Sequence, residues 1–427
     1  MKTVGFITEY NPFHNGHLYH IQKAREITNA DHIIVVMSGD FVQRGAPAIL
    51  PKHLRTQMAL QCGVSAVFEL PVCYACGSAE LFATGAISLL EQLGVVDTIC
   101  FGSECDDLSA MQRLANVLAT EPDEYKILLK SALKRGLNFP TARQDALEKY
   151  LNTENCAFLL EHPNNILGIE YLKALIRLKS PMKPYTIRRL ESDYHETRLQ
   201  ANYSSASAIR HLLAYSGSTI SSQSLETSGY ASFSNVLAEL ENQVPPSCFN
   251  LLLNNHGMRY PVYQNDFSLL LKHRLMKKSA KQLTKYQDMN RDLANRIQRE
   301  LGNYMNFEQY CELLKTKDIT YTRVNRALTH ILLGLCKKDI AHYKEQNYHY
   351  YAKLLGFRKD SQKLLRAISQ NSRIPLFTKA EDMKKIRKDG KKMLKKDIFA
   401  SDLYESAVTD RYKTAFLGEL QKPIVKV

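Results

Sequence analysis

Short apolar runs alternate with longer stretches of helical spacing along the first half of the chain. The apolar runs predict strands at residues 4–8, 32–38, 66–70, 97–103 and 184–192. Between and after them the pattern predicts helices at residues 16–27, 53–62, 79–93, 164–178 and 203–213. Strands that are apolar almost throughout and are separated by helices are typical of a parallel sheet covered on both faces. We therefore expect an α/β fold with a Rossmann-like parallel sheet.

At 427 residues the chain is long for a single domain. Residues 106–160 have helical spacing broken by two prolines and a glycine, which predicts a helical insertion. A stretch rich in Ser, Thr and Gly then marks a boundary, and the pattern beyond it is largely helical. We accordingly expect an α/β domain over residues 1–215, a linker over 216–235 and a mainly α-helical domain over 236–427.

The positive charge is concentrated in the second half of the chain. Residues 1–235 carry 21 Lys and Arg against 23 Asp and Glu, whereas residues 236–427 carry 36 against 20. A basic domain beside a near-neutral one is typical of a module that binds a polyanion. A solvated basic surface is the alternative, and the size of the asymmetry makes it the weaker one.

No apolar run is long enough to cross a bilayer, and no signal-peptide pattern is present, so we expect no membrane partner. Nine scattered cysteines, an odd number, argue against a disulfide framework and for a reducing, cytoplasmic location. Cys73 and Cys76 form one C-x-x-C pair, which could be redox-active or half of a zinc site. Because no second pair stands at ligand spacing, we expect both cysteines to be packed in the core.

The stretch NPFHNGHLYH, residues 11–20, joins the first predicted strand to the first predicted helix. In open α/β sheets ligands bind at the carboxyl ends of strands, where helix N-termini offer free backbone N–H groups to phosphate. Gly16 lacks the Cβ that would keep a phosphate away from the backbone. His14 and His17 bracket it, and their N–H groups can donate to phosphate oxygens. We predict that His14 and His17 are catalytic and that His20 reaches the nucleotide or borders the site.

The pattern H-x-G-H resembles the signature of the nucleotidyltransferase superfamily, whose members break the α–β phosphate bond of ATP. Histidines three residues apart also occur as metal ligands. A zinc site, however, needs a third ligand nearby, and the pattern H-E-x-x-H is absent. Nucleotide phosphate is therefore the preferred ligand, and no metal ligand is assigned.

A second signature of that superfamily is a Ser/Thr-rich turn that opens a late helix. In this chain YSSASAIR supplies Ser204, Ser205, Ser207 and Arg210. Hydroxyls and a guanidinium at a helix start can hold pyrophosphate, although a plain helix cap is the alternative. The match departs from the superfamily at Asn11, where an Asp is usual, so the role sometimes given to that Asp is in doubt.

Further loops follow the predicted strands. Gly102, in FGSE, would let the backbone approach a base or ribose, and Asn164, in HPNN, can bond the nucleoside or cap a helix. Arg189 can contact phosphate or form a structural ion pair. The loop SGDFVQRG is either a plain turn or a source of side chains for an acceptor substrate, namely Asp40, Gln43 and Arg44.

Taken together, six segments resemble one family: EYNPFHNGHLYH, MSGDFVQRG, FGSE, PNNILGIEYLKAL, KPYTIRRLESDYH and SSASAIR. They are similar to the tRNA(Met) cytidine acetate ligases, bacterial enzymes that make N4-acetylcytidine at the wobble position of elongator methionine tRNA. The resemblance continues into KTKDITYTRVNRALTHIL and weakens in the basic tail. It implies that ATP and acetate give acetyladenylate and pyrophosphate, and that the N4 amine of cytidine 34 then takes the acetyl group.

The resemblance also implies which residues contact ATP. They are Ile7, Thr8, Glu9, Tyr10, Asn11, Pro12, Phe13, His14, Asn15, Gly16, His17, Leu18, Tyr19, His20, Gly102, Asn164, Arg189 and Leu190. Mg²⁺ is expected with ATP, without protein ligands that the sequence identifies. Nothing in the residues themselves specifies acetate, and no protein partner can be inferred.

The same resemblance implies that the basic second half holds an anticodon stem-loop, since its Lys and Arg surplus would neutralise phosphates. Tyrosines of this half can stack on splayed bases, or can be ordinary core and surface residues. The candidates are Tyr286, Tyr304, Tyr310, Tyr321, Tyr348, Tyr350 and Tyr351. The Lys-rich segment 384–397 is either an RNA contact or a solvated helix.

Two other functions fit parts of the pattern. One is a nucleotidyltransferase for a free small molecule, of the pantetheine-phosphate or nicotinamide-mononucleotide kind. Such an enzyme would also use the H-x-G-H pattern, but it needs no large basic domain. A non-catalytic RNA-binding protein could have kept a nucleotide fold, but His14, Gly16 and His17 are intact. The acetate ligase is the function that we expect.

Overall fold

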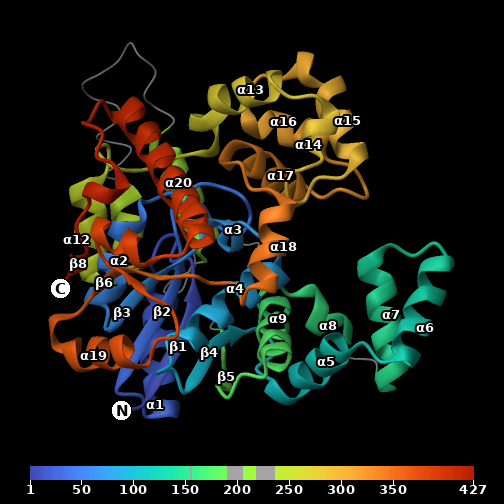
Figure 1. Ribbon diagram of the computed structural model, residues 1–427, viewed down its shortest axis with the longest axis horizontal. Coiled ribbons are helices and arrows are strands. Elements are labelled where there is room, and N and C mark those ends of the chain that lie inside the picture. The colour runs from blue at the N-terminus through green and yellow to red at the C-terminus, as the bar shows by residue number, and fades with distance from the viewer. Residues whose placement is uncertain (154–155, 190–204, 218–235) are drawn as a thin grey trace.

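The structure is a computed structural model that describes residues 1–153, 156–189, 205–217 and 236–427. A twisted, mostly parallel sheet forms its centre, with helices on both faces (Figure 1). Five parallel strands come from the first half, in the order β5-β4-β1-β2-β3. They are β1 (Thr3–Thr8), β2 (His32–Ser38), β3 (Ala66–Leu70), β4 (Thr98–Ser103) and β5 (Lys183–Arg188). The predicted α/β fold with a parallel sheet is therefore confirmed.

Helices of the first half cover the sheet, and further helices form the predicted insertion. The covering helices are α1 (Asn15–Thr28), α2 (Lys52–Gln61), α3 (Val72–Ala75), α4 (Ala79–Gln92), α9 (Pro163–Leu178) and α10 (Ala206–Gly217). The insertion is helical as predicted, with α5 (Leu108–Thr120), α6 (Asp123–Lys134), α7 (Phe139–Leu151) and α8 (Cys156–Glu161). Helix α5 packs against α9, which ties the insertion to the sheet layer.

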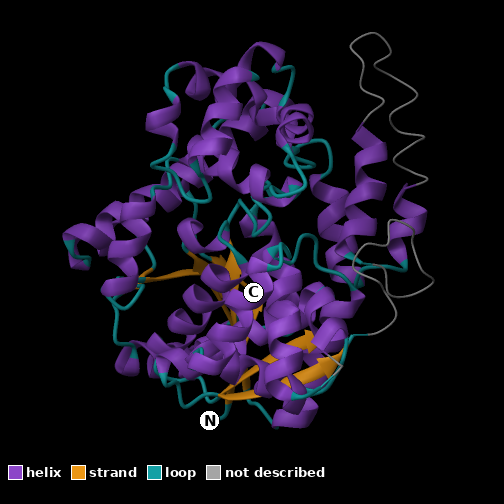
Figure 2. Cartoon of the chain, turned by 90° about the vertical axis from the view of Figure 1, so that its right-hand side faces the viewer, coloured by secondary structure: helices purple, strands orange, loops and turns teal. Residues whose placement is uncertain are grey.

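The second half begins with helices, most of which gather in a group beyond one end of the sheet (Figures 1 and 2). Its helices are α12 (Pro246–Asn255), α13 (Ser268–Met276), α14 (Ala280–Leu283), α15 (Arg291–Arg299), α16 (Phe307–Leu314), α17 (Tyr321–Leu333) and α18 (Lys337–Glu345). Helix α17 is well delimited: Thr320 caps its start by accepting from the Arg323 N–H, and Gly334, at φ 71°, ends it. A left-handed residue at a helix end is a common stop, and glycine adopts that conformation without steric cost.

The chain then returns to the sheet, which the sequence analysis did not predict. Strand β6 (Ala352–Phe357) pairs antiparallel with β3, and β7 (Leu376–Phe377) and β8 (Val425–Lys426) pair with β6. Helices α19 (Gln362–Asn371) and α20 (Lys388–Tyr412) belong to this last part, and α20 packs against both α3 and α17. The second half is mainly helical, as predicted, and residues 352–427 also complete the sheet, which was not predicted. The predicted linker, 216–235, lies almost entirely outside the described residues.

A buried cluster of charges joins this last part of the chain to the sheet. The Lys52 Nζ lies 2.7 Å from Oε1 of Glu69 and 2.7 Å from Oε1 of Glu419. Lys353, on β6, lies 2.7 Å from Oε2 of Glu69 and 2.5 Å from Oε1 of Glu419. Each of these four side chains is at most 6% exposed. Although burial alone would lower the pKa of Lys52, the surrounding carboxylates raise it well above its usual value, so the cation is retained.

Candidate active site

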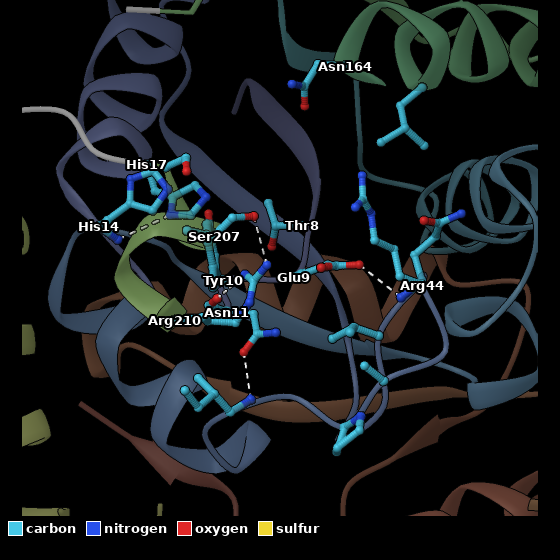
Figure 3. Close-up of a pocket in the computed structure, with 18 of the residues that line it drawn as sticks. Thr8, Glu9, Tyr10, Asn11, His14, His17, Arg44, Asn164, Ser207 and Arg210 are labelled. Atoms are coloured by element: carbon cyan, nitrogen blue, oxygen red, sulfur yellow. Dashed lines mark hydrogen bonds between the residues drawn. The ribbon is translucent and has the colours of Figure 1, made fainter. Parts of the chain in front are cut away.

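A cavity of about 470 Å³ opens at the carboxyl ends of the first-half strands (Figure 3). It lies within the range of about 300–1,000 Å³ that is common for small-molecule sites. Many of the predicted ATP contacts line it: Ile7, Thr8, Glu9, Tyr10, Asn11, His14, His17, His20, Gly102, Asn164 and Arg189. The structure therefore brings the first loop, the fourth and fifth strands and the helix at Asn164 to one place.

The other predicted contacts do not line this cavity. Phe13 is fully buried, Leu18 and Tyr19 pack on the core, and the Asn15 side chain donates to the Asn242 carbonyl. Pro12 follows a cis peptide bond in the first loop, and the Gly16 N–H donates to Nδ1 of His14. Leu190 lies outside the described residues, as does Ser204.

The two histidines of H-x-G-H are held by reciprocal hydrogen bonds at the start of α1. His14 is the N-cap, and its Nδ1 accepts from the Gly16 N–H at 3.1 Å. The Nδ1 of His17 accepts from the His14 N–H at 3.2 Å, and the two rings lie 3.7 Å apart. Because each Nδ1 accepts a hydrogen bond, each neutral ring carries its proton on Nε2. Both rings line the cavity and are fixed as Nε2–H donors.

The prediction that free backbone N–H groups of α1 form the phosphate site is not met. The Asn15 N–H donates to the Gln243 carbonyl at 3.0 Å, and the Gly16 N–H donates to His14. A Cβ on Gly16 would lie 3.0 Å from Cε1 of His14, so this glycine makes room for the imidazole. The side chains of His14 and His17, rather than the backbone of the turn, present the donors to the cavity.

Burial keeps these imidazoles uncharged. Desolvation, assisted by Arg189 and Arg210, lowers the pKa of His14 to about 3, and desolvation followed by His14 lowers the pKa of His17 well below its usual value. Burial lowers the pKa of His20 to about 4, and its ring stacks on Phe6 at 4.6 Å. All three are neutral at physiological pH.

These shifts predict an acid-sensitive fold. The unfolded chain binds protons on these histidines near pH 6.5, whereas folded His14 binds one only near pH 3 and the pKa of folded His17 also lies well below its usual value. Stability is therefore lost as the pH falls below about 6.5. Each such group contributes up to about 1.4 kcal/mol per pH unit. Urea unfolding at pH 7, 6 and 5 should show a steeper loss for wild type than for His17→Asn. An equal slope in both proteins would show that His17 is not buried uncharged.

The serine motif meets the first loop across the cavity. One guanidinium N–H of Arg210 donates to the Asn11 carbonyl at 2.8 Å, and another donates to Oγ of Ser207 at 3.0 Å (Figure 3). Ser205 accepts from the Ala208 N–H at 3.1 Å, so it is the helix cap that the sequence analysis left open as an alternative. Ser205, Ser207 and Arg210 all line the cavity.

Two predicted segments, FGSE and HPNN, are linked through a residue that sequence reasoning missed. The carboxylate of Glu104 accepts from Nδ2 of Asn164 at 2.6 Å and from the Asn165 N–H at 2.8 Å. Oδ1 of Asn165 accepts from the Glu104 N–H at 2.9 Å. A carboxylate at the first turn of α9 also suits the helix dipole. Nearby, a Cβ on Gly102 would lie 3.2 Å from Cγ of Arg189, so this glycine makes room for that side chain.

The loop SGDFVQRG contributes unequally to the cavity. Asp40 is buried, accepts from the Lys52 N–H at 2.8 Å and lies 3.7 Å from its Nζ, so it cannot serve an acceptor substrate as proposed. Gln43 and Arg44 do line the cavity. Nδ2 of Asn325 donates to the Arg44 carbonyl at 3.0 Å, which attaches the loop to α17.

Other predictions are settled by burial. Cys73 and Cys76 are buried, as expected, and burial raises the pKa of both thiols. Four of the candidate tyrosines are core residues, the alternative that the sequence analysis left open for them: Tyr286, Tyr304, Tyr310 and Tyr351. Tyr321, Tyr348 and Tyr350 are half-buried.

Within the Lys-rich segment 384–397 most lysines are exposed, whereas Met393 and Leu394 are buried. The segment therefore contains the amphipathic first turns of α20.

Several lining residues were not singled out from the sequence, among them Phe82, Tyr171, Val262, Tyr263, Gln264 and Glu308. Among the described residues, no group of three His, Cys, Asp or Glu side chains is placed to hold a metal ion. Within the same part of the chain, no helix has the length and apolar character that a bilayer crossing requires.

Known proteins similar to this chain share both its sequence and its structure. A tRNA(Met) cytidine acetate ligase of Acetivibrio thermocellus is 40% identical over 407 residues, which cover 95% of this chain and 94% of that protein. One of a Thermoanaerobacter species is 38% identical over 430 residues, covering both chains completely.

Crystal structures of Thermotoga maritima TmcAL are 30% identical to this chain. The apo form superposes with a TM-score of 0.88 and covers 99% of this chain and 98% of that one. A form bound with alpha-thio ATP has a TM-score of 0.85 and covers 99% and 97%. The family profile described as HIGH Nucleotidyl Transferase matches residues 1–417. With full-length similarity at this level and both signature motifs at one cavity, the chain belongs to the tRNA(Met) cytidine acetate ligase family of HIGH nucleotidyltransferases.

Proposed function

We propose that this protein is an ATP-dependent ligase that activates acetate as acetyladenylate. It then transfers the acetyl group to N4 of the wobble cytidine, C34, of elongator tRNA(Met). The observation that carries the proposal is the pair of neutral imidazoles, His14 and His17, fixed as Nε2–H donors on the cavity. Family membership supports the acetate and the tRNA, and the alpha-thio ATP complex of the Thermotoga relative supports the nucleotide.

In the first step a carboxylate oxygen of acetate attacks the α-phosphorus of ATP, and the bond to the β-phosphate breaks. Negative charge grows on the phosphate oxygens, and donors placed in advance stabilise it. His14 and His17 are proposed to donate to these oxygens, while Ser207 and Arg210 hold the leaving pyrophosphate. Asn164 is proposed to contact the nucleoside, and Arg189 a phosphate.

Mg²⁺ is proposed to arrive with the nucleotide. It prefers oxygen ligands and usually binds nucleotides through the phosphates with one or two carboxylates. The basic second half is proposed to hold the anticodon stem-loop, in a reducing cytoplasm where the nine cysteines stay free.

The first test is exchange of labelled pyrophosphate into ATP, with and without acetate and with and without tRNA. We expect exchange that requires acetate, followed by acetylcytidine in tRNA(Met) detected by mass analysis. Exchange that ignores acetate, or no exchange by a folded protein that binds ATP, would contradict the proposal. Either outcome would favour the small-molecule nucleotidyltransferase instead.

A further inference from the structure

Transfer of the acetyl group to an amine releases one proton. The N4 amine of cytosine attacks the acetyl carbonyl carbon, a C–N bond forms, and the C–O bond to the phosphate breaks as AMP leaves with the electron pair. One N4 proton must then leave the nitrogen. A positioned base that takes such a proton contributes about 10²–10⁴ to a rate.

We propose that Glu9 is the group that accepts this proton, an inference that rests on the proposed function. Two carboxylates are found among the described residues that line the cavity, Glu9 and Glu308. Glu9 stands at the carboxyl end of β1, next to the loop that carries His14 and His17. Glu308 is exposed on α16 and accepts from Nδ2 of Asn265 at 2.9 Å, so it lies at the rim.

The histidines on the cavity floor cannot act as this base. In His14 and His17 the Nδ1 lone pair already accepts a backbone N–H, and the Nε2 that remains carries a proton. His20 is engaged with the core, because its ring stacks on the buried Phe6 and its Nε2 lies 3.6 Å from Sγ of the buried Cys100. His211 is exposed on α10 and lies at the rim, as Glu308 does.

The other titratable groups on the cavity are no better suited. Burial raises the pKa of the phenols of Tyr10, Tyr171 and Tyr263, so they stay protonated at neutral pH. Cations that line the cavity, such as Arg44 and Arg189, cannot be deprotonated in proteins. Glu9 is therefore the acceptor that remains on the floor.

The carboxylate of Glu9 is also held in place. Its Oε1 accepts from the Gln43 N–H at 2.9 Å, and Figure 3 shows it turned toward the segment that carries Arg44. That segment is fixed from the second half, because Asn325 donates to the Arg44 carbonyl and accepts from Nε2 of Gln264 at 2.6 Å. The segment that orients the Glu9 carboxylate lies outside the phosphate-binding loop, which is the arrangement expected for a side chain that contacts the acceptor. A direct contact between this carboxylate and phosphate is unfavourable, since two anions repel.

The test separates the two half-reactions in the full-length protein. Adenylation is followed by acetate-dependent pyrophosphate exchange, and transfer by single-turnover acetylation of a tRNA(Met) transcript supplied with synthetic acetyladenylate. For Glu9→Gln we expect transfer to fall by about 10²-fold or more, and to fall at least about fiftyfold further than exchange. Glu26→Gln, an exposed substitution of the same kind on α1, serves as the matched control.

Three results would overturn the assignment. Transfer at the wild-type rate by Glu9→Gln would show that the proton goes elsewhere, and equal losses of exchange and transfer would place Glu9 in adenylation, as a Mg²⁺ or ATP contact. A selective loss of transfer in Glu308→Gln or His211→Gln, larger than in Glu9→Gln, would move the base to the rim. Thermal unfolding and ATP binding of each variant exclude misfolding. A wild-type protein that neither exchanges nor acetylates would instead refute the proposed function.

Discussion

Replacing His17 by asparagine is expected to reduce acetate-dependent pyrophosphate exchange by about 10²–10³-fold, the usual loss when one preorganised donor is removed from a transition state. The physical reason is that the Nε2–H of His17 faces the cavity, while its Nδ1 only serves the backbone. An asparagine Oδ1 can still accept from the His14 N–H, but the side chain ends before it can donate to phosphate. Exchange rates at saturating ATP and acetate measure the loss.

The comparison with alanine separates catalysis from capping. His17→Ala removes both functions, so it should lose as much exchange as His17→Asn and also lower the stability of α1. His14→Asn provides the parallel case, because His14 is the N-cap and asparagine is among the best residues there. A folded His17→Asn or His17→Ala protein that exchanges at the wild-type rate would contradict the role given to this imidazole.

Much of the first half could be predicted because its signals are local. Strands β2 and β3 have the bounds that their apolar runs predict, 32–38 and 66–70. The first loop and YSSASAIR stand at the ends of such elements, so the topology of a parallel sheet places them on one cavity. Their meeting through Arg210 and Asn11 follows from the sheet rather than from the motifs themselves.

What could not be predicted depends on contacts between distant parts of the chain. The Asn15 N–H donates to the Gln243 carbonyl, and nothing in the sequence near either residue indicates this hydrogen bond. Strand β6 is a six-residue segment, mostly apolar but interrupted by Lys353, and such a short segment cannot be told from a buried helical turn by pattern alone. The sequence places Asp40 in a loop but does not indicate that this carboxylate is buried next to the ammonium of Lys52.

That buried charge cluster makes Lys52→Met the substitution with the largest expected effect on stability. We expect the free energy of unfolding to fall by about 3–5 kcal/mol, as when one partner of a buried ion pair is removed. Methionine keeps much of the volume of the stem, so the loss reports the charge. With the cation gone, Lys353 is the one ammonium left within contact of Glu69 and Glu419 among the described residues. Urea denaturation followed by circular dichroism measures the change.

Lys23→Met is the matched control, since Lys23 pairs with Glu26 on the exposed face of α1 and such pairs contribute about 0–1 kcal/mol. Adding Glu419→Gln to Lys52→Met should restore part of the loss, because one uncompensated carboxylate is removed with the cation. A change below about 1 kcal/mol in Lys52→Met would mean that the cluster is not a buried, charged contact. Glu419 and Lys353 belong to the part of the chain that returns to the sheet, so the substitution also tests that return. If residues 352–427 detach first, the dependence of stability on urea becomes shallower, whereas an unchanged slope shows that they unfold together with the strands of the first half.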